Sequence, residues 1–430
     1  RDTCTELLSH RDILLTLEIW GVGPVTFWYT EPVSVASCHP VCVVLRRSHL
    51  NSSQQPLVSV LVPICNVERY LDQCLVTQTY DNLEVICIND GSTDGSKAII
   101  DGFVSKDSRF TCIDKPNSGY GDSMNKGLEA ACGTYVSILE SDDFLDPEGI
   151  AYMVDAAETQ DLEVFKCNFW LHWTCGLPEY SYRNNVYFPF SSPEMVGMGP
   201  HAPRDYPQVF WGKASIWSAL YRKSLLDENN IRFLPTPGAS YQDSSFTFKV
   251  LSCCVRIAYS ERAFLHYRQD NEHSSVNSKG KVYCTCDEHA EMSHFLDEDR
   301  PDLKPALDPV RAYVKFLNYA WNYDRLADQF KPEFLERFST EMRQEIERGT
   351  IPPCVLDGSV FKDVDVAPFQ YFWKEQVEEL RDVAYNKEFY AAQRASRAGG
   401  GKVATFKNYW HAGGLGGIAK LIARKAQGKA

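Results

Sequence analysis

The sequence predicts an α/β protein with a doubly wound, mostly parallel sheet and a helical C-terminal region. From Val58 onward, short β-branched runs alternate with segments of helical periodicity, which is typical of βαβ units. Polar clusters directly follow the second, third and fourth predicted strands, at the sheet edge where such folds bind ligands. From about Asp308 the apolar pattern is almost wholly helical.

The predicted elements follow one another without long gaps up to residue 168. Short apolar runs bounded by turn residues predict strands at 58–64, 83–90, 110–114, 134–140 and 162–168. Apolar residues at helical spacing predict helices at 67–80, 97–107, 119–133 and 146–160. Beyond them, 169–267 is aromatic and interrupted by Pro and Gly, as expected of loops that shape a pocket.

Composition limits the classes of function. The 430 residues allow two or three domains, and a net charge of −13 argues against a general nucleic-acid binder. The 15 cysteines are scattered through apolar stretches, which indicates reduced, core-filling residues of a cytoplasmic protein. Cys284, Cys286 and His289 come nearest to a metal cluster, but they lack a second ligand pair.

The two ends of the chain differ from the rest. Residues 1–55 are predicted to be a weakly structured extension. "SVASC" at Cys38 resembles a lipoprotein cleavage box, but Glu18 and Glu31 interrupt the apolar segment of a leader. Residues 402–430 hold six Lys or Arg and no acid, which favours either a basic amphipathic helix on an anionic membrane surface or a solvated tail.

The run "ILESDDF" places Glu140, Asp142 and Asp143 directly after a predicted strand. Acids beside a buried strand need a positive partner, either a divalent cation or an Arg/Lys pair. Carboxylate ligands suit Mg²⁺ or Mn²⁺, which typically also coordinate substrate phosphates. Taken alone, the run is also compatible with a helix N-cap at Ser141 or Asp142.

Several motifs in order resemble the family 2 glycosyltransferases of the GT-A fold. They are "VSVLVPICN", "NDGSTDGS", "NSGYGDSMNKG", "SILESDDF" and "YQDSSF". The similarity covers about residues 57–165 and continues at 241–251, and it is greatest to bacterial capsule and exopolysaccharide enzymes. It implies an inverting, metal-dependent transfer of a sugar from a nucleotide-diphosphate sugar, with a UDP-sugar expected, to a hydroxyl of a saccharide or lipid-linked acceptor.

The resemblance also implies roles for individual residues. Asp243 matches the catalytic base, and Asp142 with Glu140 matches the D-x-D motif that binds Mn²⁺ or Mg²⁺. The implied donor-binding residues are Pro63, Asn66, Asp90, Lys115, Asn117, Gly119, Gly121, Asn125 and Ser141. Trp211, His266 and Arg268 are predicted diphosphate or acceptor contacts.

Two residues depart from the family pattern. Glu140 stands where the family has the first Asp of D-x-D, and Gln242 stands where Glu usually precedes the base. Gln242 removes a charge beside Asp243, which should leave the base less perturbed by like-charge repulsion. Neither change deletes a group that the implied chemistry requires.

The implied mechanism is a single displacement. The metal offsets charge on the departing nucleoside diphosphate, while Asp243 takes the proton from the attacking hydroxyl. Alone, Asp243 is also compatible with a helix cap, and Trp217 with either sugar stacking or core packing.

The resemblance divides the chain into a catalytic domain at 56–275, a helical region at 276–401 and the tail. Residues 56–168 form the nucleotide-sugar half of the catalytic domain and 169–275 the acceptor half. The expected location is cytoplasmic, at the inner face of the plasma membrane through the tail, and no nucleic-acid partner is expected.

Two alternatives differ in function. One is a catalytically silent GT-A-like binding or scaffold protein of a polysaccharide assembly complex. The other, a nucleotidyltransferase, would need a Gly-rich loop with Arg and Lys near the first strand, where the sequence offers only Arg69.

Overall fold

The computed structural model describes residues 15–19, 22–27, 55–75, 78–177, 183–272, 280–362 and 368–397. The chain divides into two compact units, residues 1–54 and 55–430. In the first, β1 (Leu15–Ile19) pairs antiparallel with β2 (Val22–Phe27), a hairpin that the predicted weakly structured extension did not include. The basic tail lies outside the described residues.

The second unit is built on a nine-stranded sheet in the order β5-β4-β3-β6-β10-β8-β11-β7, with β9 beside β8. The predicted α/β fold with a parallel βαβ core is confirmed, because β3 runs parallel to β4 and β6, and β4 runs parallel to β5. β10 is antiparallel to both of its neighbours, so the whole sheet is mixed. The strands are β3 (Val58–Ile64), β4 (Leu83–Asp90), β5 (Phe110–Lys115), β6 (Tyr135–Ile138), β7 (Phe144–Leu145), β8 (Val164–Leu177), β9 (Arg183–Phe188), β10 (Ala219–Arg222) and β11 (Ile257–Arg268).

Helices connect the strands as the periodicity predicted. The connecting helices are α1 (Glu68–Cys74), α2 (Ser96–Val104), α3 (Tyr120–Ala130) and α4 (Gly149–Gln160). Apart from Ser59, β3 consists of apolar residues, and it is buried along its whole length, as expected of a strand covered on both faces. Cysteines such as Cys87 and Cys167 are free thiols buried in this core, in agreement with the prediction.

The prediction of loops over 169–267 was wrong for much of that range. β8 continues to Leu177 and pairs with β9 and β11, because aromatic residues in this stretch suit a strand as well as a loop. Besides β9, β10 and β11, the elements there are short helices and one longer helix at the site. They are α5 (Pro193–Gly197), η3 (Pro203–Asp205), η4 (Pro207–Trp211), η5 (Ile216–Ser218), α6 (Lys223–Glu228) and α7 (Asp243–Cys253).

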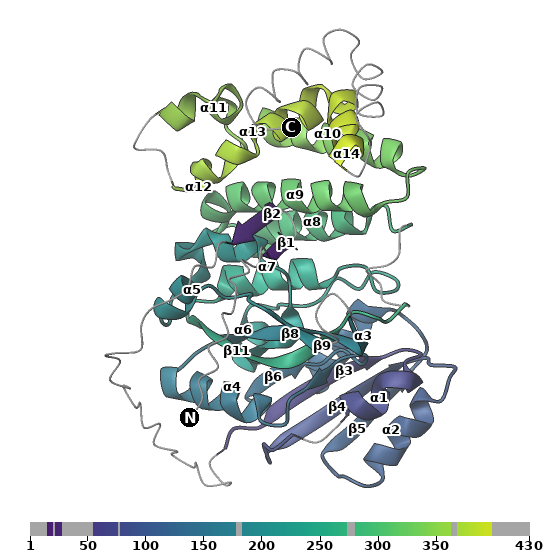
Figure 1. Ribbon diagram of the computed structural model, residues 1–430. Helices are drawn as coiled ribbons and strands as arrows, with labels where there is room; N and C mark the ends of the chain where they lie inside the picture. The colour runs from purple at the N-terminus through teal and green to yellow at the C-terminus, as the bar shows by residue number, and fades with distance from the viewer. Residues whose placement is uncertain are drawn as a thin grey trace, which may run out of the picture. The chain divides into compact units, whose positions relative to one another are not determined.

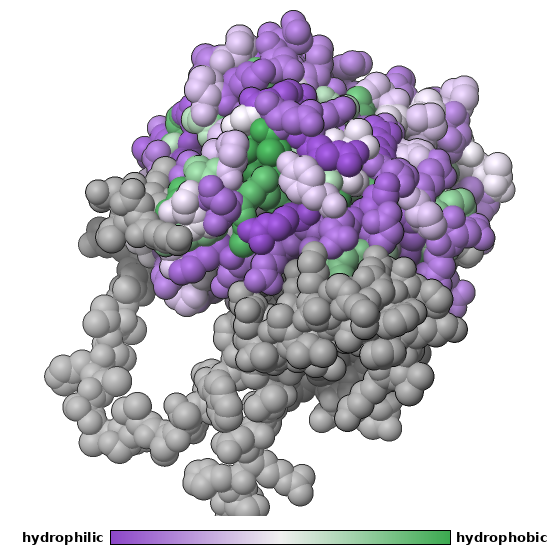
Figure 2. Space-filling view, turned by 90° about the horizontal axis from the view of Figure 1, so that it is seen from above, coloured by the Kyte–Doolittle hydropathy of each residue, from purple (hydrophilic) through white to green (hydrophobic). Residues whose placement is uncertain are grey.

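The C-terminal helices stack beyond α7, on the side away from the strands (Figure 1). They form a second hydrophobic core, while α8, η7 and the first turns of α9 also contribute residues to the core around the sheet. Figure 2 shows their outer end, which is mostly hydrophilic with a narrow hydrophobic strip. No described helix has the length and hydropathy needed to cross a membrane. The elements are α8 (Cys284–His294), η7 (Phe295–Asp299), α9 (Lys304–Arg325), α10 (Lys331–Glu347), α11 (Pro353–Asp357), η8 (Ser359–Lys362), α12 (Pro368–Tyr371), η9 (Phe372–Glu375), α13 (Val377–Tyr385) and α14 (Lys387–Arg397).

Candidate active site

Acids from two distant segments come together beyond the carboxyl end of β6. Glu140 and Asp142 follow that strand, and Asp243 is the first residue of α7. Burial raises the pKa of Glu140 to about 8, and the charges of Asp142 and Asp243 add to this effect. The predicted metal-binding pair and the predicted base therefore share one electrostatic environment.

Tyr120 is a site residue that the sequence analysis did not identify. Its hydroxyl donates a 2.6 Å hydrogen bond to Oε1 of Glu140, which opposes the rise in the pKa of that acid. Tyr120 is the first residue of α3, and an isolated Tyr beside glycines carries no pattern that would predict this contact.

Arg268 holds the acidic loop in place. Its main-chain N–H donates to Oδ1 of Asp143 at 2.7 Å, and its Nε donates to the carbonyl of Asp142 at 2.7 Å. The guanidinium also donates to Thr174 and Gln73, and the residue is only 4% exposed. Three side-chain donors of Arg268 are thus bound to protein oxygens, and the diphosphate contact expected of this residue stays a prediction.

Asp142 keeps acceptor capacity within this loop. Asn271 donates to its Oδ2 at 2.8 Å, and a carboxylate offers about four acceptor positions in total. Asn271 is buried and follows β11 by a few residues, so the loop after that strand supports the predicted metal ligand.

The surroundings of Asp243 shift the pKa of its carboxyl group. Its Oδ1 is buried and has no hydrogen-bond partner among the described residues. Burial raises its pKa to about 6, whereas Lys213 and main-chain hydrogen bonds lower it. A pKa near the working pH is what general-base catalysis favours.

Lys213 is the second site residue that the sequence analysis missed. Burial lowers its pKa to about 8, and the charges of Asp243 and Asp143 oppose that shift. Its Nζ lies 4.4 Å from the centre of the Tyr267 ring. A single Lys in the aromatic run "FWGKASIW" carries no sequence signal for this position.

Hydrogen bonds to the segment before Asp243 explain why Gln stands at position 242. Its Nε2 donates to Oγ1 of Thr236 at 2.9 Å and to the carbonyl of Gly238 at 3.0 Å, and its Oε1 accepts from the N–H of Ser240 at 2.6 Å. Glu could not donate to those oxygens. The amide is therefore a structural requirement of the loop.

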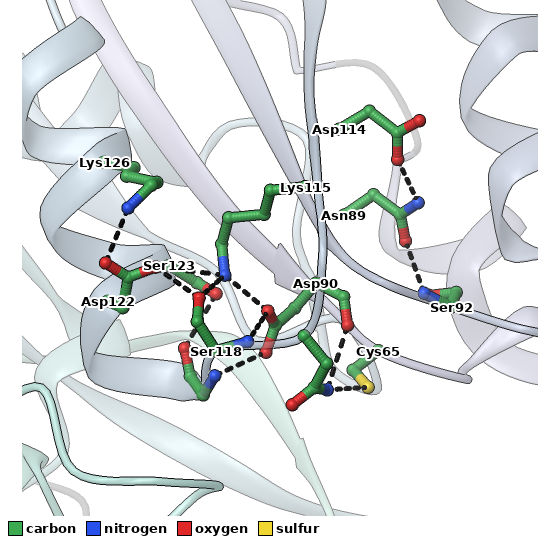
Figure 3. Close-up of polar contacts among 12 residues, drawn as sticks. Cys65, Asn89, Asp90, Ser92, Asp114, Lys115, Ser118, Asp122, Ser123 and Lys126 are labelled. Atoms are coloured by element: carbon green, nitrogen blue, oxygen red, sulfur yellow. Dashed lines mark hydrogen bonds and ion pairs between the residues drawn. The ribbon is translucent and has the colours of Figure 1, made fainter.

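Asp90 is the centre of a polar network at the end of β4 (Figure 3). It accepts hydrogen bonds from the N–H groups of Ser118 and Gly119 at 2.8 and 3.0 Å. Lys115 also pairs with Asp90, and its Nζ lies 3.2 Å from Oδ2 of Asp122. Asp90 and Lys115 thus shape the loop before α3, with most of their polar groups engaged.

Three of the predicted donor-binding residues lie against the segment that leads to Asp243. A Cβ on Gly121 would lie 2.1 Å from the carbonyl oxygen of Leu234, and one on Gly119 would lie 2.8 Å from Gly238 N. Asn125 exchanges two hydrogen bonds with the main chain of Phe233, at 2.9 and 2.8 Å. We call residues 233–240 the base strap, because these contacts fasten it to α3.

The remaining predicted donor-binding residues line the same sheet edge. Pro63 is buried in β3, and Ser141 is buried in the acidic loop. Asn66 adopts a φ of 54° and accepts a hydrogen bond from Thr93 N at 2.7 Å. Asn117 donates to the carbonyl of Asp90 at 3.0 Å.

Two other predicted contacts belong to the protein interior. Nε2 of His266 lies 3.0 Å from Oδ1 of Asp146, and its ring stacks on Phe144 at 4.3 Å. Trp211 packs on Tyr313 and Phe372 at 5.0 and 4.7 Å between ring centres. These contacts account for much of both side chains, and the diphosphate or acceptor contacts expected of the two residues stay predictions.

The weak metal candidate in α8 does not form a cluster. Cys286 lies in the helical core, and Nε2 of His289 is 3.0 Å from the side chain of Asn318. Among the described residues, no group of three His, Cys, Asp or Glu side chains is arranged to hold a metal ion.

Comparison with known proteins identifies the sheet region. Residues 59–212 match the family described as Glycosyl transferase family 2. The putative glycosyltransferase EpsH of Bacillus subtilis is 30% identical over 225 residues, 50% of this chain and 61% of that protein. The uncharacterized glycosyltransferase EpsJ of the same organism is 28% identical over 221 residues, 50% of this chain and 62% of that protein. This chain thus spans less than two thirds of these relatives.

A solved structure supports the same fold. S. aureus TarS 1-349 in complex with UDP-GlcNAc gives a TM-score of 0.54 at 17% identity, covering 79% of this chain and 91% of that chain. The likeness at this identity concerns the fold. Together with the family match, it shows that residues 59–212 form a domain similar to glycosyl transferase family 2, within a region that has the GT-A fold.

Proposed function

We propose that this protein transfers a sugar, with inversion, from a nucleotide-diphosphate sugar to a hydroxyl of a saccharide or lipid-linked acceptor in cell-surface polysaccharide synthesis. The observation that carries the proposal is the pairing of a buried carboxylate of raised pKa, Asp243, with the acidic loop at the sheet edge. A UDP-sugar is the proposed donor, since a protein of the same fold binds UDP-GlcNAc.

Asp243 acts as the general base. Its buried Oδ1 has unused acceptor capacity, and accepting the proton of an acceptor hydroxyl would satisfy it as the hydroxyl oxygen attacks the anomeric carbon. Attack from the face opposite the departing diphosphate inverts that centre. On the donor side, Asp90 uses three of about four acceptor positions on protein donors and keeps one for a nucleobase N–H.

The acidic loop fits Mn²⁺ or Mg²⁺ in chemistry. Asp142 and Glu140 would hold the ion through carboxylate oxygens, which both cations prefer. Protein sites for Mg²⁺ often use one or two carboxylates together with substrate phosphates, so the lack of a three-residue cluster in the described part of the chain agrees with this arrangement. When bound, the ion would supply positive charge for the departing diphosphate.

A peripheral membrane contact is part of the proposal. The basic residues of 402–430 suit an anionic lipid surface. Such a contact would place the protein at the inner face of the plasma membrane, where a lipid-linked acceptor is accessible.

The decisive experiment compares Asp243→Asn with wild type and with Asp101→Asn, an exposed acid paired with Lys97 on α2. UDP- and GDP-sugars are first screened with Mn²⁺ by thermal unfolding, and transfer to membrane-derived acceptors is then measured with the labelled donor that binds. Asp243→Asn should keep donor binding and lose transfer by about 10²–10⁴-fold, the usual contribution of a general base. Transfer at the wild-type rate would refute the proposed base.

The same experiment separates the enzyme from the alternative scaffold function. Donor binding without transfer by wild type to any membrane-derived acceptor would favour a binding protein. If no nucleotide sugar stabilises the wild-type protein, with or without metal, the proposed function fails.

A further inference from the structure

A buried acid from the C-terminal helical region contacts the first turn of α7. Glu288 lies on α8 and is only 1% exposed. Its Oε2 accepts a 3.2 Å hydrogen bond from the main-chain N–H of Ser245, two residues after the proposed base. Its Oε1 is also buried and has no hydrogen-bond partner among the described residues. Burial of a carboxyl group is costly unless it is hydrogen-bonded, so the contact with α7 calls for an explanation.

The start of α7 needs hydrogen-bond acceptors from outside the helix. The first N–H groups of a helix have no partner within it. Gln242 stands at the N-cap position, but its side chain makes no capping hydrogen bond. The N–H groups of Asp243 and Ser244 interact with the Asp243 carboxylate itself. Glu288 satisfies the next N–H, that of Ser245, so two acids from distant segments together cap the helix that carries the base.

The two acids differ in protonation. Burial raises the pKa of Glu288 to about 8, hydrogen bonding with Ser245 opposes this rise, and the charge of Asp243 adds to it while that of Lys249 opposes it. The pKa of Asp243 is about 6. At neutral pH Glu288 is therefore uncharged while Asp243 is ionised. A neutral carboxyl still accepts the Ser245 N–H, and it adds no second negative charge near the base.

Other contacts tie the helical region to the same segment. Glu291, one turn after Glu288 on α8, pairs with Lys249 of α7 at 2.5 Å. From α9, the Trp321 ring meets that of Tyr241 edge-on at 5.2 Å between centres. The helical region thus contacts residues on both sides of the base in the sequence, and Glu288 makes the contact nearest to the start of α7 on the C-terminal side.

We propose that Glu288 is a positioning residue for Asp243, because its hydrogen bond to Ser245 fixes the first turn of α7 and with it the carboxylate that receives the acceptor's proton. This inference rests on the proposed function and extends the same site to α8, which lies outside the residues 59–212 that match the family. A displacement of about 1 Å in a reacting group can cost up to about 10²-fold in rate, so the effect should appear in kcat.

The test compares Glu288→Met and Glu288→Gln with wild type in the full chain. Met has a similar length but offers Ser245 no oxygen, and it should lower kcat about ten-fold or more. Gln keeps an acceptor oxygen and is uncharged like the native acid, so kcat should stay within about three-fold of wild type. Transfer is measured with the UDP-sugar that binds in the screen above, and the affinity for UDP with Mn²⁺, measured by calorimetry, should stay within about two-fold in both variants.

Glu291→Met is the matched control, since it makes the same substitution one turn away on the same helix and removes another polar contact with α7. It leaves Lys249 without its carboxylate partner and should lower the unfolding temperature. Its kcat per folded molecule should stay within about two-fold of wild type, because the contact lies a turn or more from the base. In Glu288→Gln the acid limb of the pH profile should stay near pH 6, as Glu288 is uncharged where Asp243 titrates.

The inference is wrong if folded Glu288→Met transfers sugar with the wild-type kcat, or if Glu288→Met and Glu291→Met lose kcat equally. An acid limb moved by a full unit in Glu288→Gln would also overturn it, since Glu288 would then act through charge. Should Glu288→Met fail to fold, Glu288→Asp decides, because its shorter side chain withdraws the acceptor from Ser245 and should likewise lower kcat.

The two proposals fail in different ways. Loss of transfer in Asp243→Asn, with none in Glu288→Met, would overturn only the role of Glu288. Transfer at the wild-type rate in Asp243→Asn would instead refute the proposed base.

Discussion

Lys213 and Asp243 carry opposite charges in one buried environment, and each affects the protonation of the other. Burial alone would drive both toward their neutral forms. Because each charge stabilises the other, Asp243 remains ionised near neutral pH and can act as a base. We regard Lys213 as a positioning residue for the proposed reaction.

Replacing Lys213 by Met should change how activity depends on pH. The proposed reaction requires ionised Asp243, whose pKa of about 6 places the expected acid limb of the kcat/KM profile near that pH. Removing the Lys213 charge takes away the largest effect that opposes burial, raises the pKa of Asp243 and should move the acid limb upward by about 1 unit or more. Initial rates from pH 5 to 9 measure this effect.

Lys213→Arg is the control for charge at this position. It should keep the acid limb within a few tenths of a unit of wild type, since the positive charge remains. An unchanged acid limb in Lys213→Met, together with a lower rate at every pH, would mean that Lys213 contributes only to packing.

At the scale of elements, the base strap connects the donor half of the site with the base. Residues 233–240 lie against the start of α3, where Gly119 and Gly121 leave room for their main chain. Asn125 on α3 completes the attachment at Phe233. A change in α3 should therefore reach Asp243 through the strap.

Gly121→Ala should destabilise the protein by about 1–3 kcal/mol, the usual cost of forcing extra atoms into a packed site. The new Cβ would sit 2.1 Å from the carbonyl oxygen of Leu234, so the strap must shift. Urea unfolding gives the stability, and the transfer rate reports the displacement of Asp243.

Gly102→Ala in α2 is the matched control, because a Cβ there meets nothing within 4 Å. In a helix interior this change should stabilise the protein by roughly 0.5–1 kcal/mol. Equal effects of the two substitutions would contradict the close approach of strap and helix.

The elements also show what the sequence could predict. β3 and β4 have the predicted bounds, because local β-branched runs specify strands buried on both faces. β8 was predicted only as far as residue 168 and β11 was not predicted at all, since their pairing joins segments about 90 residues apart, such as Val164 with Ile257.

The residues of the candidate site also fall into a group that the sequence could predict and a group that it could not. Asp142 and Asp243 lie in local motifs that the sequence displays. Lys213 and Tyr120 acquire their roles only through folding, when separate segments meet at the acidic loop. For Arg268 and His266, the sequence could not show that protein oxygens contact their polar groups.

At the scale of the whole molecule, Trp211 joins the two hydrophobic cores of residues 55–430. It packs against members of both, including Tyr313 and Phe372 on the helical side. The helical region is therefore expected to unfold together with the sheet region rather than independently.

Trp211→Ala should cost about 3–5 kcal/mol, as for other large aromatic truncations, and should reduce the cooperativity between the cores. Calorimetry should show a broadened or split transition where wild type gives one. Tyr371→Ala removes an aromatic ring that is 55% exposed and should change stability by no more than about 0.5 kcal/mol. A single sharp transition in Trp211→Ala would show that other contacts couple the cores.

The contacts of α9 with Tyr241, directly after the base strap, limit how this protein can be re-engineered. Exchanging C-terminal helices between related transferases is an attractive route to new products, since the nucleotide-binding half would stay intact. Here such a hybrid would lose Trp321 and Arg325, which surround Tyr241. A functional hybrid would have to take residues 233–243 and α9 from the same parent protein.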